Sequence, residues 1–121
     1  MYVPDHFAMS DQDRDAFLAD LRAADLITAT SDGLLATYLP LHHEPDPDGG
    51  SPGRLQGHLA RNNPQWRSPV VGEAMVIVHG PDSYISPGFY PSKQEHGRTV
   101  PTWNYVTAHI YGRLVIHEDP E

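Results

Sequence analysis

The chain has 121 residues, enough for one small domain with its own core, and its 16 acidic against 8 basic side chains give a net charge of −8. A surface of this sign repels a phosphate backbone, which disfavours direct nucleic-acid binding, and the lack of cysteine excludes disulfides and thiolate chemistry. Neither a signal-peptide pattern nor an apolar run of roughly 18 residues occurs, so the sequence predicts a soluble, cytoplasmic protein that does not enter a membrane.

A single helix is predicted near the start of the chain, over residues 11–24. Ser10 can cap its first turn through the side-chain hydroxyl, and Asp13 stands near the positive end of the helix dipole. Apolar residues then recur at helical spacing, at Ala16, Phe17, Leu21 and Ala24. This stripe predicts a helix that packs one face against the rest of the domain.

Six strand-like runs are spread over the rest of the chain. They cover residues 26–30, 34–42, 54–60, 74–79, 84–86 and 103–117. Asp32 and Gly33 form a tight turn between the first two runs, which predicts a β-hairpin, and Pro64 begins a short helical turn over residues 65–68. With one main helix, six runs indicate a mainly β protein built on a closed or nearly closed antiparallel barrel.

The connection between the last two runs is rich in aromatic and hydroxyl side chains. Connecting loops are usually short and polar, so Phe, Tyr and Trp gathered in one loop indicate a binding surface. The polar side chains next to these rings are Ser86, Ser92, Lys93, Arg98 and Thr102. Flat rings beside hydroxyls and cations suit a ligand that is part planar ring and part anion, such as a flavin or pyridoxal phosphate.

A second candidate site lies where the third run ends. Alternation along a strand places His58 and Ala60 on one face, and the chain then delivers Arg61, Asn62 and Asn63 at the turn. Free backbone N–H groups, a guanidinium and two carboxamides form a plausible phosphate pocket. The alternative is that the two asparagines only cap the turn and that Arg61 is solvated.

The eight histidines do not have the spacing of a metal site. His42 and His43 are adjacent on a strand and point to opposite faces, and no H-x-x-x-H or H-E-x-x-H pattern occurs. We interpret His79 and His109 as hydrogen-bonded residues of the barrel, and heme ligation by a histidine as a minor alternative. No metal is predicted.

Trp103 and Asn104 open the last strand-like run and have two interpretations. Trp103 can stack on a ligand ring while Asn104 bonds to the edge of a heterocycle. A Trp at a strand start can equally close the end of a barrel or a dimer seam.

Three motifs in this order resemble the PaiB-like family of FMN-binding negative transcriptional regulators. They are Gly57-His-Leu-Ala-Arg-Asn-Asn-Pro64, Tyr84-Ile-Ser-Pro-x-x-Tyr-Pro-Ser-Lys93 and Val100-Pro-Thr-Trp-Asn-Tyr105. The resemblance runs over residues 1–121, which we expect to form one domain without the family's C-terminal extension. Family members usually read His-Leu-Pro where this chain has Tyr38-Leu39-Pro40.

The resemblance implies the FMN-binding split barrel, a six-stranded antiparallel Greek-key barrel with an N-terminal helix. Such barrels form homodimers with two flavins at the subunit interface, so FMN is the implied cofactor, ahead of heme. The implied contacts with the flavin ring come from Ala36, Tyr38, Leu39 and Pro40. The implied ribityl and phosphate contacts come from His58, Leu59, Arg61 and Asn62, with Lys93 as a further phosphate ligand and Trp103 and Asn104 reaching in from the partner chain.

The function implied by the resemblance is that of a negative transcriptional regulator, although no DNA-binding motif is evident in the sequence. A flavin-dependent oxidoreductase that uses a nicotinamide donor is the alternative. His58 and Tyr38 are its only candidate acid/base residues near the implied ring. A flavin or heme carrier without turnover is a third interpretation, so the sequence leaves open whether the protein is an enzyme.

Overall fold

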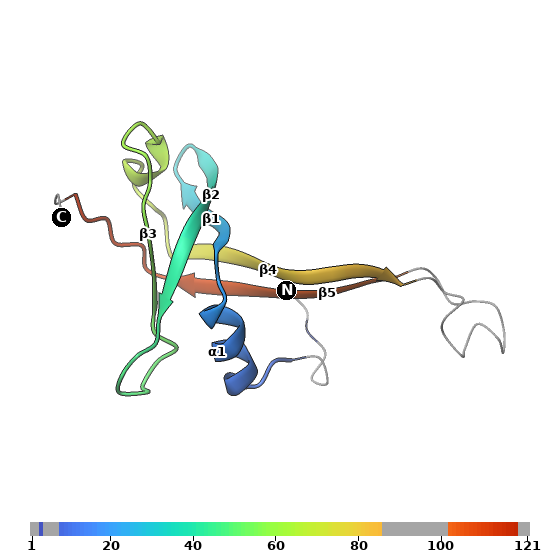
Figure 1. The fold of residues 1–121 in the computed structure, drawn as a ribbon. Coiled ribbons are helices and arrows are strands. Elements are labelled where there is room, and N and C mark those ends of the chain that lie inside the picture. The colour runs from blue at the N-terminus through green and yellow to red at the C-terminus, as the bar shows by residue number, and fades with distance from the viewer. Residues whose placement is uncertain (1–2, 4–7, 86–101, 119–121) are drawn as a thin grey trace, which may run out of the picture.

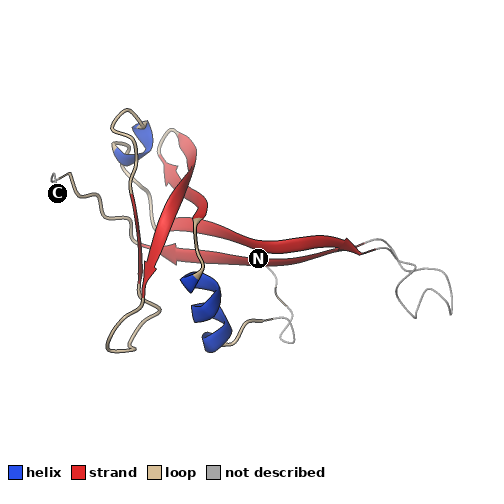
Figure 2. Ribbon diagram, in the orientation of Figure 1, coloured by secondary structure: helices blue, strands red, loops and turns tan. Residues whose placement is uncertain are grey.

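The computed structural model describes residue 3 and residues 8–85 and 102–118. Within them one helix, α1 (Asp11–Ala19), precedes five strands, and a short 3-10 helix, η2 (Pro64–Trp66), stands between the third and fourth strands. The strands are β1 (Ala23–Thr30), β2 (Gly33–Glu44), β3 (Arg54–Gly57), β4 (Ala74–Ile85) and β5 (Thr102–Gly112). The described part is therefore mainly β, as predicted (Figures 1 and 2).

The five strands form one antiparallel sheet in the order β3-β2-β1-β4-β5. Strands β1, β2 and β3 follow one another through hairpins, and the chain then returns by a long connection to place β4 beside β1, which is the Greek-key arrangement. Strands β4 and β5 project well beyond the other three as a long two-stranded arm (Figure 1). The described residues show an open sheet with five strands, whereas the sequence predicted six.

The strand count differs because two predicted strands are one. Residues 74–79 and 84–86 were expected as separate strands, but β4 runs without a break from Ala74 to Ile85. The Gly80-Pro81 pair, which lies between the two expected strands, coincides with a shift of register between His79 and Asp82. A β-bulge of this kind accommodates a proline without an N–H donor while the ladder continues on both sides.

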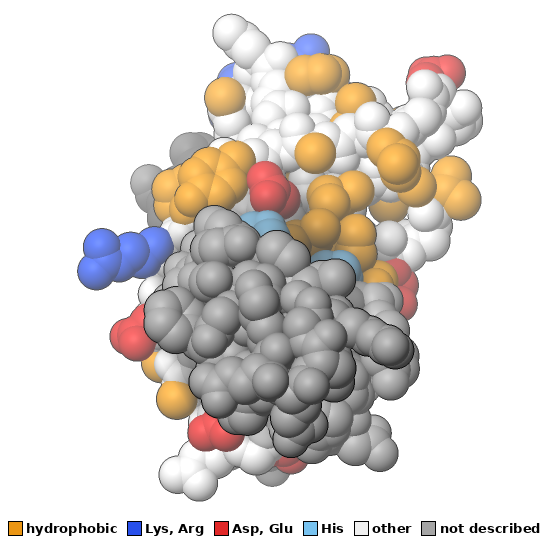
Figure 3. Space-filling view, turned by 90° about the vertical axis from the view of Figure 1, so that its right-hand side faces the viewer, with side chains coloured by type: hydrophobic (Ala, Val, Ile, Leu, Met, Phe, Trp, Pro, Cys, Tyr) orange, Lys and Arg blue, Asp and Glu red, His pale blue; other side chains and the backbone are white. Residues whose placement is uncertain are grey.

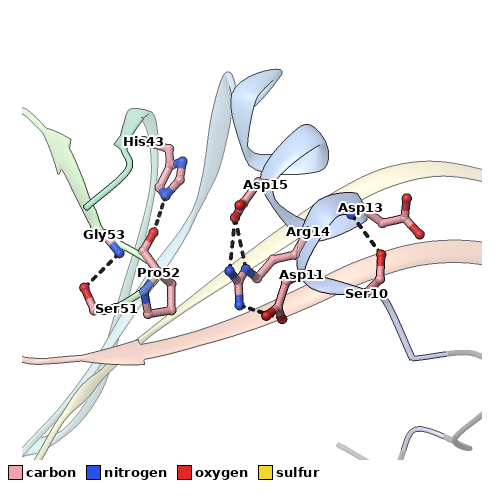
Figure 4. A network of polar contacts seen from close by, with 9 residues as sticks. All are labelled: Ser10, Asp11, Asp13, Arg14, Asp15, His43, Ser51, Pro52 and Gly53. Carbon is pink, nitrogen blue, oxygen red and sulfur yellow. Dashed lines mark hydrogen bonds and ion pairs between the residues drawn. The ribbon is translucent and has the colours of Figure 1, made fainter. Parts of the chain in front are cut away.

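The helix predicted over residues 11–24 is too long, because residues 23 and 24 belong to β1. Ser10 caps α1 as predicted, its Oγ accepting from the backbone N–H of Asp13 at 3.1 Å (Figure 4). Arg14 forms ion pairs with Asp11 and Asp15 on the exposed side. The helix ends at Ala19, and Ala24, expected on the helical stripe, is only 1% exposed in β1. Alternation of buried residues along β1 outweighs the helical spacing.

The core lies on one face of the sheet, which we call the inner face. Its buried residues are Ala24, Leu26, Leu39, Ala74, Val76 and Val78. Phe17 of α1 packs against this cluster, so the helix covers the inner face. Because side chains alternate along each strand, the opposite or outer face carries the residues between these positions.

The outer face is largely apolar in the described part. Register aligns Ala36, Ile27, Met75 and Tyr111 in one row across four strands. The neighbouring row is Tyr38, Asp25, Ile77 and His109. Leu34, Tyr38 and Tyr111 are 75%, 71% and 59% exposed. Such a concentration of exposed large apolar side chains on a sheet is typical of an interaction surface.

Candidate functional site

The segment that follows β3 runs along the edge of β2. Gly57 pairs with Leu41 at the end of the β2–β3 ladder. Further along, the Asn63 side chain donates from Nδ2 to Thr37 Oγ1 at 2.9 Å. Both ends of residues 58–62 are thus held against residues 37–41 of β2. The structure thus places residues 58–62, which include the ribityl and phosphate contacts implied there by the resemblance, along the part of β2 that carries the implied ring contacts.

Along β2 the assigned ring contacts divide between the two faces. Ala36, Tyr38 and Pro40 are exposed on the outer face, and we call them the outer strip. Leu39 is 5% exposed and belongs to the core. The outer strip is therefore the part of this group whose side chains a planar ring can reach.

The assigned phosphate contacts divide in the same way. Leu59 packs against the core cluster that contains Leu39, whereas His58 is exposed. If the β2–β3 register is continued past Gly57, Leu59 falls opposite Leu39 and His58 falls opposite Pro40. The common burial of the two leucines agrees with that register. His58 then lies on the outer side, next to the outer strip.

Arg61 and Asn62 form the corner of a tight turn that lies beyond His58. The backbone N–H of Asn63 donates to the Ala60 carbonyl at 2.9 Å and closes this turn. Both side chains at the corner are exposed. The ion pairs within the described residues are those of Arg14 and Arg54, so Arg61 has no acidic partner there. A free guanidinium and a carboxamide on a fixed turn are suited to binding a phosphate.

One aromatic and one cationic side chain hold this turn through its backbone. The Arg61 carbonyl accepts from Trp66 Nε1 at 3.0 Å and from the Arg67 guanidinium. Arg67 in turn stacks over the Trp66 ring, 5.0 Å from its centroid. These contacts fix the backbone of Arg61 and leave its own guanidinium exposed.

Trp103 and Asn104 lie away from this region of the same chain. They pair with Tyr84 and Ser83 on the arm formed by β4 and β5, which points away from β2 and β3 in Figure 1. Lys93 lies outside the described residues. The structure therefore does not bring Trp103 and Asn104 to the outer strip of their own chain.

Sequence reasoning missed Gln65, which joins these elements. It was expected only as part of a helical turn, yet it is 1% exposed and bonds to both β1 and β2. A glutamine between Pro64 and Trp66 gives no pattern that distinguishes a buried side chain from a solvated one. Asn63 does cap this turn, its Oδ1 accepting from Gln65 N at 2.9 Å, as the alternative interpretation held.

Two hollows in the described surface lie elsewhere. One, of about 330 Å³, is lined by η2 and the residues after β5, including Arg67 and Arg113. The other, of about 760 Å³, is lined by the β2–β3 loop. There the backbone N–H of Asp48 lowers the pKa of the Asp46 carboxyl, and His43 Nε2 bonds to the Pro52 carbonyl at 2.7 Å (Figure 4). Neither of these hollows is lined by the outer strip or by Arg61. Tyr38 and Arg61 are themselves exposed, so their side chains are accessible in a single chain.

Comparison with known proteins decides the family. The family model described as "Putative FMN-binding domain" matches residues 1–121. The chain is also 31% identical over 123 residues to the protease synthase and sporulation protein PAI 2 of Bacillus subtilis, covering 100% of this chain and 56% of that protein. The chain belongs to the PaiB-like FMN-binding family.

Other relatives of this PaiB-like chain occur in fungi. The uncharacterized protein YKL070W of Saccharomyces cerevisiae is 32% identical over 91 residues, which cover 74% of this chain and 53% of that protein. The uncharacterized protein AN0679 of Emericella nidulans is 34% identical over 87 residues, 57% of this chain and 35% of that protein. The PaiB-like chain spans about half or less of the length of these relatives.

Membership of this family supports FMN as the cofactor. The donor set in the structure fits it, because a turn with an exposed guanidinium is held beside β2, which carries the outer strip with the exposed ring of Tyr38. The described residues include no helix long and apolar enough to cross a membrane.

The close approach of β3 to β2 depends on Gly57. A Cβ at this position would lie 2.8 Å from the Pro40 carbonyl oxygen and 2.7 Å from Leu41 Cδ2. We expect Gly57→Ala to lower the free energy of unfolding by about 1–3 kcal/mol, because a backbone atom has to shift. Gly112→Ala is the matched control, since nothing lies within 4 Å of its added Cβ. Urea denaturation of both variants measures the effect, and equal stability of the two would contradict the contact.

Proposed function

We propose that this chain is an FMN-binding split-barrel protein of the PaiB type, with the phosphate at the Arg61–Asn62 turn and the ring against the outer strip. The observation that supports this assignment is the position of residues 58–62 along β2, held at Gly57 and at Asn63. Arg61 and Asn62 bind the phosphate oxygens, and His58 lies between the turn and Pro40 on the side of the ribityl chain. Ala36 and Tyr38 supply the surface on which the ring rests.

The protein acts as a homodimer with FMN at the seam. Support comes from the open outer strip, since a single chain offers a flavin only one wall, and binding sites usually enclose most of their ligand. Apolar side chains are exposed in patches on the side toward which the arm points (Figure 3). The outer rows that contain Tyr111 and Tyr38 supply the contact surface. The projecting arm brings Trp103 and Asn104 to the flavin of the partner subunit.

The bound flavin serves regulation, as a negative transcriptional regulator without a DNA-reading element of its own. The relative from Bacillus subtilis carries a name that links it to protease synthesis and sporulation. A net charge of −8 opposes contact with DNA, and within the described residues α1 is the single α-helix, whereas a helix-turn-helix needs two. Regulation then acts through a protein partner that responds to the flavin-bound state.

The test of this proposal is the visible spectrum of the purified protein after incubation with FMN and gel filtration. We expect a flavin spectrum that elutes with the protein at one FMN per chain. Anaerobic addition of NADH or NADPH is then expected to leave the oxidised spectrum stable. Bleaching would instead assign the protein to the flavin-dependent oxidoreductases, and a Soret band would replace FMN by heme. Elution without any flavin would refute the proposal.

A further inference from the structure

A buried polar network links the predicted phosphate turn to the sheet, and Gln65 is at its centre. The Gln65 side chain is 1% exposed and lies between β1 and β2 on the inner side. Its Nε2 donates to the carbonyls of Leu26 and Leu35 and to Thr28 Oγ1, each at 3.1 Å. Its Oε1 accepts from Thr37 Oγ1. All the polar atoms of this side chain are therefore paired, in a place that excludes water.

The same network extends to the turn that carries Arg61. Thr37 Oγ1 donates to Gln65 and accepts from Asn63 Nδ2 at 2.9 Å. Asn63 Oδ1 accepts from the backbone N–H of Gln65 at 2.9 Å, and Asn63 N closes the turn on Ala60. Hydrogen bonds through the side chains of Gln65, Thr37 and Asn63 thus lead from the interior of the sheet to the residue next to Asn62.

A second set of hydrogen bonds connects η2 and the residue after it to the turn that carries Arg61. Trp66 and Arg67 follow Gln65 directly, and both donate to the Arg61 carbonyl. Ser68 Oγ and the Arg67 backbone N–H close on the Pro64 carbonyl at 2.9 Å and 3.1 Å. If Gln65 is displaced, η2 and the donors to Arg61 move with it.

We propose that Gln65 is the positioning residue of the phosphate turn and sets the preference of the site for FMN over riboflavin. This inference rests on the proposed function. The network lies beneath Arg61 and Asn62, which face the phosphate, while the outer strip faces the ring from β2. Disturbing the network therefore affects the interaction that FMN makes and riboflavin lacks. Charged hydrogen bonds to phosphate depend steeply on geometry, so small displacements of Arg61 reduce affinity strongly.

The test uses two variants of the whole chain and one matched control. Gln65→Met keeps the length of the side chain and removes its polar atoms. Thr37→Val removes only the hydroxyl that joins Gln65 to Asn63, so it is the milder variant and keeps the test decisive where Gln65→Met does not fold. Thr107→Val is the control, because Thr107 is also half-buried on a strand and its Oγ1 donates to the Val78 carbonyl at 3.0 Å.

The measurement is the dissociation constant of FMN and of riboflavin, each from quenching of flavin fluorescence, together with the circular dichroism of every variant. We expect the FMN preference to fall about tenfold or more in Gln65→Met and about threefold or more in Thr37→Val, with riboflavin affinity changed less than about twofold. Thr107→Val is expected to keep the preference of the unmodified protein.

The outcomes separate this inference from the proposed function. If the unmodified protein binds no FMN, both fail. If it binds FMN in preference to riboflavin and the folded variants lose affinity for the two flavins in parallel, or lose none, the positioning role of Gln65 is refuted and the FMN site stands. A preference that falls in Gln65→Met or Thr37→Val but not in Thr107→Val supports the role.

Discussion

Replacing Arg61 by alanine is expected to weaken FMN binding by about ten- to a hundredfold, because a charge-assisted hydrogen bond contributes about 1.5–3 kcal/mol. Arg61 is exposed at the corner of its turn, and none of the ion pairs within the described residues uses it. Its loss therefore removes a ligand contact without leaving a buried partner unpaired. Riboflavin, which has no phosphate, is expected to bind the variant as it binds the unmodified protein. Fluorescence titration with both flavins measures the two affinities.

The matched control for this variant is Arg54→Ala. Arg54 is also an exposed arginine on the segment that begins with β3, but it pairs with Glu44 at 2.7 Å at the opposite end of that strand. We expect its replacement to leave FMN affinity unchanged. Arg61→Lys is expected to bind FMN with intermediate affinity, since lysine keeps the charge and loses the planar fork. Equal weakening by Arg61→Ala and Arg54→Ala would show a general electrostatic effect and remove Arg61 from the site.

Local signals in the sequence predicted a large part of this fold. The Ser10 cap, the tight turn at Gly33 and the helical turn that starts at Pro64 were all predicted and are confirmed. Each is decided by the chemistry of one or two residues: a hydroxyl that accepts from a backbone N–H, a glycine with φ of 124°, and a proline that needs no donor. Such signals do not depend on the rest of the fold.

Tertiary contacts decided the features that the sequence predicted wrongly. Ala24 fits a helical stripe as well as a strand, and pairing of β1 with β2 decides for the strand. Residues 74–79 and 84–86 were expected as separate strands, but pairing of β4 with β5 on both sides of Gly80-Pro81 keeps one strand. The end of the last strand at Gly112, not at residue 117, coincides with the end of its partner at Ala74. In each case the partner strand supplies the hydrogen bonds that fix the boundary.

The exposed residues of the candidate site could be predicted from the sequence, whereas the role of the buried Gln65 could not. Strand alternation places Ala36, Tyr38 and Pro40 on one face, and the outward position of these three is seen in the structure. The role of Gln65 depends on bonds to Leu26 and Leu35, which are far from it in sequence. The local sequence around Gln65 does not indicate such distant partners. The hydrogen bonds that support the turn are therefore seen only in the folded structure.

Introducing a carboxylate on the outer face is expected to break the proposed homodimer. Tyr111 is 59% exposed and lies in the apolar row with Met75, Ile27 and Ala36. In Tyr111→Glu a charge would be buried at the seam without a partner, which costs several kcal/mol. We expect the dissociation constant of the dimer to rise by about a hundredfold or more. Sedimentation velocity over a concentration series measures it.

The same variant tests where the flavin binds, because Tyr111 belongs to β5 and not to the outer strip of β2. If FMN lies at the seam, the monomeric Tyr111→Glu protein is expected to lose affinity for FMN and riboflavin alike, by about tenfold or more, since one wall of the site is removed. Val115→Glu is the control, as Val115 is 52% exposed beyond the end of β5, and both assembly and flavin binding should persist. A monomer that binds FMN with unchanged affinity would place the whole flavin site within one chain, and an unmodified protein that is already monomeric would leave the outer face without the proposed partner.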